Sequence, residues 1–189
     1  MINEAIQNGI ADIGENRAQE ILEKFAEVLP VNWHMIGHLQ RNKVKAIIDK
    51  VRLIHSVDSI ELAEEINRRA GAAGIRMDVL IQVNTAGEQS KFGIAADEAG
   101  VLLPQVLERC ENVRVRGLMC MAPYADDPED VRPFFKATKT LFDSFKAIDH
   151  ERLDLKYLSM GMSGDFGVAI EEGSNMVRIG TAIFGNRNY

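Results

Sequence analysis

The residues best suited to chemistry are small and polar, and they follow two short apolar runs in the last third of the chain. Ser163 and Gly164 come after one run, and Gly180 and Thr181 come after the next. Glycine lets a backbone N–H approach an oxygen atom closely, while Ser and Thr hydroxyls donate further hydrogen bonds without a full charge. This combination predicts a site for a phosphate monoester, although tight turns alone would also explain either loop.

Three histidines are a second candidate for chemistry. His34, His38 and His55 could bind a metal ion, but they fall on different predicted elements and no carboxylate-rich motif accompanies them. We therefore expect no metal site.

The elements that would position these residues form a regular series. Short apolar runs alternate with longer amphipathic ones, as in a parallel sheet wrapped by helices. The seven runs predicted to be strands are Ile10 to Ile13, Trp33 to Ile36, Leu53 to Val57, Asp78 to Asn84, Val113 to Met121, Tyr157 to Met160 and Met176 to Ile179. Seven strands with six helices between them are one unit short of a (β/α)8 barrel.

The shortage has a predicted location at the start of the chain. Ile2 to Gln7 reads as the last turns of a helix that Asn8-Gly9 stops, which implies an earlier strand. We expect an α/β fold of the (β/α)8 TIM-barrel type without its first strand, in one domain over residues 1–189. An open seven-stranded sheet is the alternative. Capping boxes at Asn16 and Asp58 are predicted to begin two of the helices.

Composition narrows the class of protein. A chain of 189 residues with 46% hydrophobic content can bury one sizeable core, and its net charge of −6 disfavours binding to nucleic acid or anionic lipid. Cys110 and Cys120 have no disulfide or zinc-site spacing, so we expect reduced, half-buried thiols. No apolar run approaches the roughly 20 residues that span a bilayer, and no secretion signal is recognisable, so a cytosolic location is expected.

Motifs in a fixed order along nearly the whole chain carry a resemblance to a known family. They are Gly14-Glu15-Asn16, Trp33 to Lys43, Ile54 to Asp58, Gln82 to Asn84, Glu88 to Gly93, Arg116 to Met119, Leu158 to Ser163 and Val177 to Gly185. The chain resembles the pyridoxal 5'-phosphate (PLP) homeostasis proteins, also called YggS/PROSC-like, whose fold is similar to the barrel domain of alanine racemase. Members bind PLP and have no established catalytic reaction.

The resemblance implies a set of cofactor-binding residues. Around the ring it places Asn16, His34 and Met160, and on the phosphate Ser163, Gly180 and Thr181. It also places Arg178 opposite the pyridine nitrogen, which keeps that nitrogen unprotonated and weakens the ring as an electron sink. Without the resemblance, Arg178 would be interpreted as a salt-bridged residue at a strand end.

The chain departs from the family at one important point. The family's Schiff-base lysine lies on the first barrel strand in a Ser-Lys-Thr-like motif, upstream of every residue present here. This agrees with the missing strand, and we interpret the chain as N-terminally truncated or begun at a misplaced start codon, with a lysine-free paralogue as the alternative. Lys91 follows the strand ending at Asn84, but we interpret it as a solvated loop lysine rather than a substitute.

These observations predict a non-catalytic PLP carrier or buffer, with PLP and PLP-dependent apo-enzymes as its partners. One rival is a PLP-dependent racemase-like or decarboxylase-like enzyme of the same barrel type. The other is an interaction module without cofactor, which would use apolar surface exposed around the missing strand.

Overall fold

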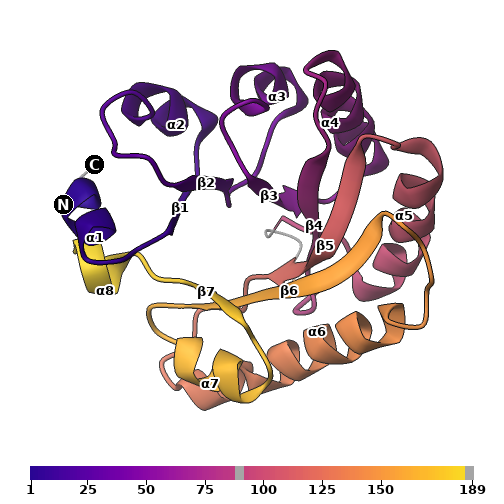
Figure 1. The fold of residues 1–189 in the computed structure, drawn as a ribbon. Helices are drawn as coiled ribbons and strands as arrows, with labels where there is room; N and C mark the ends of the chain where they lie inside the picture. The colour runs from indigo at the N-terminus through magenta and orange to yellow at the C-terminus, as the bar shows by residue number, and fades with distance from the viewer. Residues whose placement is uncertain (88–91, 186–189) are drawn as a thin grey trace.

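The computed structural model describes residues 1–87 and 92–185 of the chain. In these ranges seven parallel strands form one sheet, in the order in which they occur along the sequence. They are β1 (Asp12–Glu15), β2 (Asn32–Met35), β3 (Leu53–Val57), β4 (Met77–Val83), β5 (Val113–Cys120), β6 (Leu153–Met162) and β7 (Met176–Arg178). Figure 1 shows the strands curving around a common centre, with β1 and β7 as the two edges. The expected barrel-type fold is confirmed as a nearly closed seven-stranded barrel.

Helices cover the outside of this sheet, and most of them connect one strand to the next (Figure 1). They are α1 (Ile2–Gln7), α2 (Ala18–Lys24), α3 (Arg41–Ile47), α4 (Ile60–Ala72), α5 (Ala96–Arg109), the 3-10 helix η1 (Pro128–Val131), α6 (Arg132–Phe145), α7 (Phe166–Glu171) and α8 (Thr181–Phe184). Among the described residues, none of the helices has the length and apolar character needed to cross a membrane.

All seven predicted strands are present, but β1 begins two residues later than expected. Gly9 has φ +99°, and the backbone N–H of Ile10 donates to Ala5 O at 3.1 Å. These residues therefore still belong to the C-terminal turn of α1, as the Asn8-Gly9 stop predicts. Strand pairing starts only at Asp12, opposite Asn32 of β2.

The two predicted capping boxes are wrong. The residue that precedes α2 is Arg17, and no side chain caps that helix. Asn16 stays in the loop after β1, where its carbonyl oxygen would lie 2.3 Å from a Cβ atom on Gly37. The two loops therefore pack backbone against backbone. At α4 the cap is Ser59 rather than Asp58, and its Oγ accepts a hydrogen bond from Leu62 N at 3.4 Å.

The buried apolar side chains divide into two clusters, one on each face of the sheet. The larger lies between strands and helices, and the smaller contains Leu53, Leu80 and Met119. Successive residues of a strand point to opposite faces, and Ile54, next to Leu53, belongs to the larger cluster. The smaller cluster therefore fills the inside of the barrel.

Both cysteines are free thiols, but the expectation that they are half-buried is wrong. Cys110 and Cys120 are 0% and 1% exposed and belong to the larger cluster. Burial raises the pKa of each thiol to about 11.

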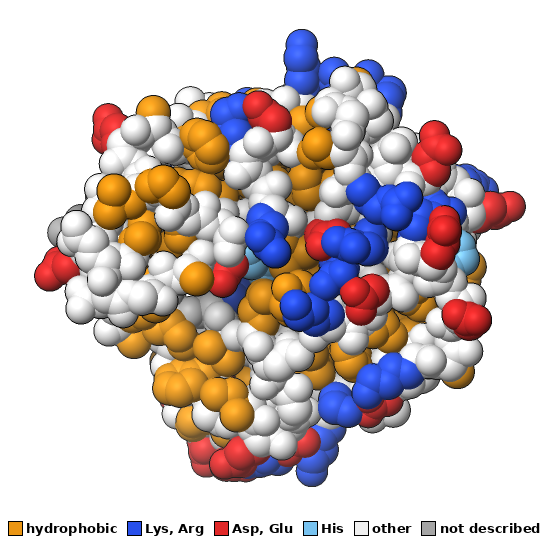
Figure 2. Space-filling model, in the orientation of Figure 1, with side chains coloured by type: hydrophobic (Ala, Val, Ile, Leu, Met, Phe, Trp, Pro, Cys, Tyr) orange, Lys and Arg blue, Asp and Glu red, His pale blue; other side chains and the backbone are white. Residues whose placement is uncertain are grey.

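Some of the exposed apolar side chains belong to elements next to the edge strands. Among them are Leu22 on α2, Ile170 on α7, and Ile183 and Phe184 on α8. Figure 2 shows hydrophobic side chains gathered on the left of the view, where Figure 1 places α1, α2, α7 and α8. Towards the centre and right, Lys and Arg side chains are mixed with Asp and Glu, so this face has no large patch of one charge.

Candidate functional site

The loops that follow β6 and β7 meet through Ser163. The backbone N–H groups of Gly180 and Ala182 both donate to Ser163 Oγ at 3.3 Å. Two N–H groups that converge on one oxygen make a concavity suited to an anion. Thr181 lies between these donors at the start of α8 and is exposed. The structure thus brings together the three residues predicted to hold a phosphate.

The glycines near these loops have two different roles. Gly161 has φ +91°, and a Cβ there would lie 2.7 Å from Ala169 Cβ, so glycine is needed for α7 to pack on β6. At Gly164 and Gly180 a Cβ would meet no atom within 4 Å. Packing therefore does not require glycine at these two positions. Open space beside them is what a ligand that approaches the backbone needs.

Arg178, the last residue of β7, is a cation whose hydrogen-bond partners in the described part of the chain are all neutral. It donates from Nη1 to Ser159 O at 2.9 Å and to Ser159 Oγ at 2.6 Å, and from Nη2 to Cys120 O at 2.8 Å. Within the described ranges no carboxylate oxygen lies within 4.0 Å of it. Burial lowers the pKa of Arg178, with opposing effects from Cys120 and Asp165. The guanidinium stays protonated at neutral pH, so the site has positive charge available for a ligand.

From Ser159 a row of polar contacts continues through the inside of the barrel. Ser159 Oγ lies 3.2 Å from His55 Nδ1, and His55 Nε2 lies 3.0 Å from His34 Nδ1. His34 Nε2 then lies 3.2 Å from Asp12 Oδ1. The neighbours of these residues along the strands, such as Trp33 and Leu158, belong to the outer cluster. All four polar side chains therefore point inward.

Burial keeps both histidines of this row neutral. It lowers the pKa of His55 well below the usual value, and the charges of His34 and Arg178 lower it further. Burial also lowers the pKa of His34, an effect that Asp12 opposes and Arg52 strengthens. At neutral pH each ring therefore has one N–H donor and one bare nitrogen acceptor.

The remaining predicted residues take different positions. Asn16 lies just after β1, at the carboxyl end of the strands where the Ser163 loop also lies. Met160 is fully buried in the larger cluster, on the face of β6 opposite Ser159. Contacts of Asn16, His34 and Met160 with a ring stay predictions. Lys91 lies outside the described residues.

Sequence reasoning missed the two residues that connect His34 to Arg178. The sequence predicts no role for Ser159 or His55 beyond their motifs, Leu158 to Ser163 and Ile54 to Asp58, and the possibility that His55 is a metal ligand. The usable signal was a polar residue at an inward position of a buried strand, two residues after Leu53. His38 is separate, since it stacks on Phe92 with ring centroids 4.1 Å apart. Among the described residues, no group of three or more His, Cys, Asp or Glu could hold a metal ion.

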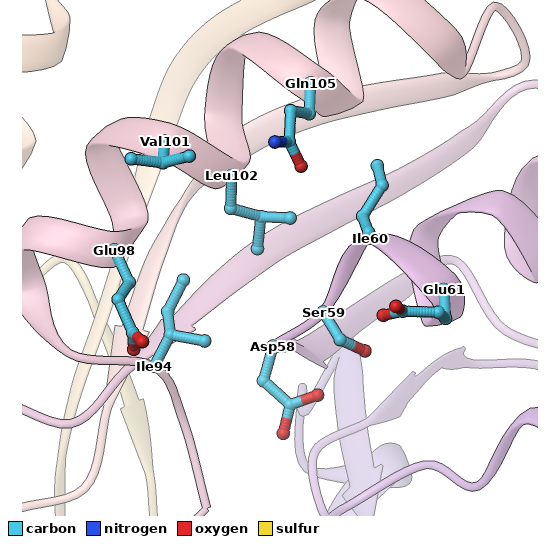
Figure 3. A pocket seen from close by; sticks show the side chains of 9 residues that line it. All are labelled: Asp58, Ser59, Ile60, Glu61, Ile94, Glu98, Val101, Leu102 and Gln105. Carbon is cyan, nitrogen blue, oxygen red and sulfur yellow. The ribbon is translucent and has the colours of Figure 1, made fainter.

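An open hollow of about 280 Å³ lies elsewhere, between the start of α4 and the first turns of α5 (Figure 3). Asp58, Glu61 and Glu98 contribute carboxyl groups to its lining, with Val101 and Leu102 as apolar members. Three acidic side chains make it unfavourable for a phosphate. None of the predicted cofactor-binding residues lines it.

Comparison with known proteins gives consistent matches over the whole chain. The family model described as alanine racemase, N-terminal domain, matches residues 1–188. A pyridoxal phosphate homeostasis protein from Aquifex aeolicus is 47% identical over 191 residues, covering 100% of this chain and 82% of that protein. The protein of the same name from Homo sapiens is 35% identical over 201 residues, covering 100% and 73%.

Solved structures agree with these relatives. PipY from Synechococcus elongatus, solved with PLP bound, has a TM-score of 0.88 and 36% identity over 97% of this chain and 86% of that one. An alanine racemase from Clostridium difficile has a TM-score of 0.76 at 16% identity, over 97% of this chain and 47% of that one. The second likeness shows the fold alone.

Proposed function

Because the chain belongs to the pyridoxal phosphate homeostasis protein family, we propose that it binds PLP at the carboxyl ends of β6 and β7 and holds it in reserve. The observation that carries the proposal is the pairing of two features at this place. Gly180 N and Ala182 N converge on the single oxygen of Ser163, and Arg178 on the adjoining strand has only neutral hydrogen-bond partners among the described residues. A phosphate monoester with a hydrogen-bond-accepting ring satisfies both.

Different residues would bind the phosphate and the ring of PLP. Ser163, Gly180 and Thr181 would donate to the phosphate, whose oxygens can take the place of Ser163 Oγ in front of the two N–H groups. Arg178 would meet the pyridine nitrogen. A guanidinium has only donors, so a nitrogen that pairs with it must accept and stay unprotonated. PLP supplies electron-sink chemistry when bound, and an unprotonated ring is the weaker sink.

We propose that the role is non-catalytic, with PLP-dependent apo-enzymes as recipients of the cofactor. The weak electron sink and the relatives' homeostasis name support a carrier over an enzyme. Free, buried Cys110 and Cys120 suit a reducing compartment such as the cytosol.

Titration with PLP tests the site through Thr181. Replacing Thr181 with Val removes a hydroxyl donor and nearly keeps the volume. A hydrogen bond to a charged group is worth roughly 1.5–3 kcal/mol, so PLP should bind about 10-fold more weakly or worse. Thr140→Val, another exposed helical threonine, is the matched control and should bind like wild type. Equal PLP affinity in Thr181→Val and wild type would contradict the proposed phosphate site.

Two assays separate the proposal from its rivals. Turnover of amino acids by the PLP-loaded protein would favour a racemase-like or decarboxylase-like enzyme. Absence of PLP binding in equilibrium dialysis would favour an interaction module. Borohydride reduction followed by peptide mass analysis reports any covalent link to a lysine, and a pyridoxyl adduct on Lys91 would make that lysine a substitute for the family's usual one.

A further inference from the structure

The row of polar contacts inside the barrel can be given a direction from its acidic end. The carboxylate of Asp12 only accepts, so His34 must donate to it from Nε2 over 3.2 Å. Neutral His34 then has a bare Nδ1, which accepts from His55 Nε2 over 3.0 Å. Neutral His55 is left with a bare Nδ1 that faces Ser159 Oγ over 3.2 Å.

The basic end of the row is compatible with this assignment. The guanidinium of Arg178 only donates, so Ser159 Oγ accepts its hydrogen bond of 2.6 Å. The hydroxyl hydrogen of Ser159 can then point at the bare Nδ1 of His55. Every contact from Arg178 to Asp12 has one donor and one acceptor, all in the same sense.

This arrangement depends on the charge state of its members. A protonated His55 carries a hydrogen on Nδ1, cannot accept from Ser159, and adds a positive charge near Arg178. The charged groups that act on the pair are Asp12 and Arg52 at His34, and Arg178 at His55. Asp12, at the start of β1, has a side chain that is 52% exposed, whereas Arg178 ends β7. The row therefore joins opposite ends of the barrel.

We propose that Ser159, His55 and His34 are positioning residues that hold Arg178 in the orientation in which it meets the ring of PLP. Ser159 fixes Nη1 with both its carbonyl and its hydroxyl oxygen, so turning Arg178 away breaks two hydrogen bonds. The identity of the ligand rests on the proposed function, but the hydrogen-bond chain is a property of the protein without ligand. Protonation of either histidine breaks this row of hydrogen bonds and weakens PLP binding.

The row of hydrogen bonds from Arg178 to Asp12 is tested first, in protein without any ligand. NMR spectra of the 189-residue protein with ¹⁵N-labelled histidine report which ring nitrogens carry a hydrogen. At neutral pH, His34 and His55 should both be neutral, with hydrogen on Nε2 and a bare Nδ1. Hydrogen on Nδ1 of either residue would contradict the proposed row of hydrogen bonds, whether or not the protein binds PLP.

The positioning role is tested with Ser159→Ala and two probes, PLP and inorganic phosphate. Ser159→Ala removes the hydroxyl that accepts from the Arg178 guanidinium but keeps the carbonyl oxygen that also accepts from Nη1. We therefore expect about 5-fold weaker PLP binding, while phosphate, which has no ring, should bind as to wild type. Ser144→Ala, on the exposed face of α6, is the matched control. Unchanged PLP affinity, or an equal loss of affinity for both probes, would show that Ser159 does not position Arg178 for the ring. A wild-type protein that binds no PLP would overturn the ligand and this role of Arg178 together, while the NMR result would still decide the chain.

A pH profile provides a readout that a merely structural role would not move. Asp12→Asn removes the charge that favours protonation of His34, so the acidic loss of PLP affinity should shift to lower pH. PLP's own titration is common to all variants and cancels in the comparison. Asp154→Asn, an exposed carboxylate paired with Arg116 instead, should keep the wild-type midpoint. An unshifted midpoint in Asp12→Asn, or an equal shift in Asp154→Asn, would contradict the proposal.

Discussion

Leu53 and His55 are two residues apart on the same inward face of β3, yet they belong to different environments. Leu53 packs with Leu80 and Met119, and burial of apolar surface stabilises this half of the barrel interior. His55 lies in the half where each polar atom needs a matched partner, because an unpaired polar group in a buried site is costly. The apolar half contributes stability, and the polar half contributes the placement of Arg178.

Replacing Leu80 with Ala should therefore give the largest loss of stability. Leu80 is 0% exposed, and such a substitution in a close-packed interior costs about 2–5 kcal/mol of unfolding free energy. PLP affinity of the folded variant should stay near wild type, since Leu80 belongs to the apolar half. Urea denaturation measures the loss, with Val101→Ala at a 60% exposed site of α5 as the control. Equal midpoints in the two variants would mean that the barrel interior is loosely packed.

Acid should destabilise the polar half by a smaller amount. Burial lowers the pKa of His34 and His55 in the folded protein, so below about pH 6.5 the unfolded chain binds more protons than the folded one. Stability is thus full above that pH and falls below it, by at most about 1.4 kcal/mol per pH unit for each histidine. Denaturation at pH 7.5 and 5.5 measures the fall. His55→Asn should reduce it, and a wild-type stability equal at both pH values would show that folding does not lower the pKa values of these histidines.

The sequence predicts the strands and the loops well because each depends on the pattern of residues close together in the chain. The period of apolar residues predicts all seven strands, and the Asn8-Gly9 stop is confirmed by the positive φ of Gly9. The Ser163 and Gly180 contact follows from the rule that loops after adjacent parallel strands meet at one end of the barrel. These features need no knowledge of distant contacts.

The polar row could not be predicted in the same way. Ser159 and His55 are 104 residues apart, and their contact depends on the register of the strands. Irregular pairing shifts that register between Ser159 and Met162 in β6 and between Ile54 and Val57 in β3. One residue of register reverses the face of every side chain. The cap at α2 failed for a related reason, since the close approach of Gly37 to the Asn16 backbone involves a separate strand and loop.

The smallest effect is expected in thiol labelling, where Cys110 and Cys120 should react alike. Cys120 lies beside the polar half, with its carbonyl oxygen bonded to Arg178, and Cys110 lies beyond the end of α5. The charge of Arg178 favours the thiolate of Cys120, but burial outweighs it and raises the pKa to about 11, as for Cys110. At pH 8 neither thiol should react with iodoacetamide until the protein opens, since both are almost fully buried. Mass spectrometry should show equal, slow rates at the two sites, and both should label fully in denaturant. Faster labelling of Cys120 alone would show that the polar half opens independently of the rest of the barrel, because opening of the whole fold exposes both thiols at once.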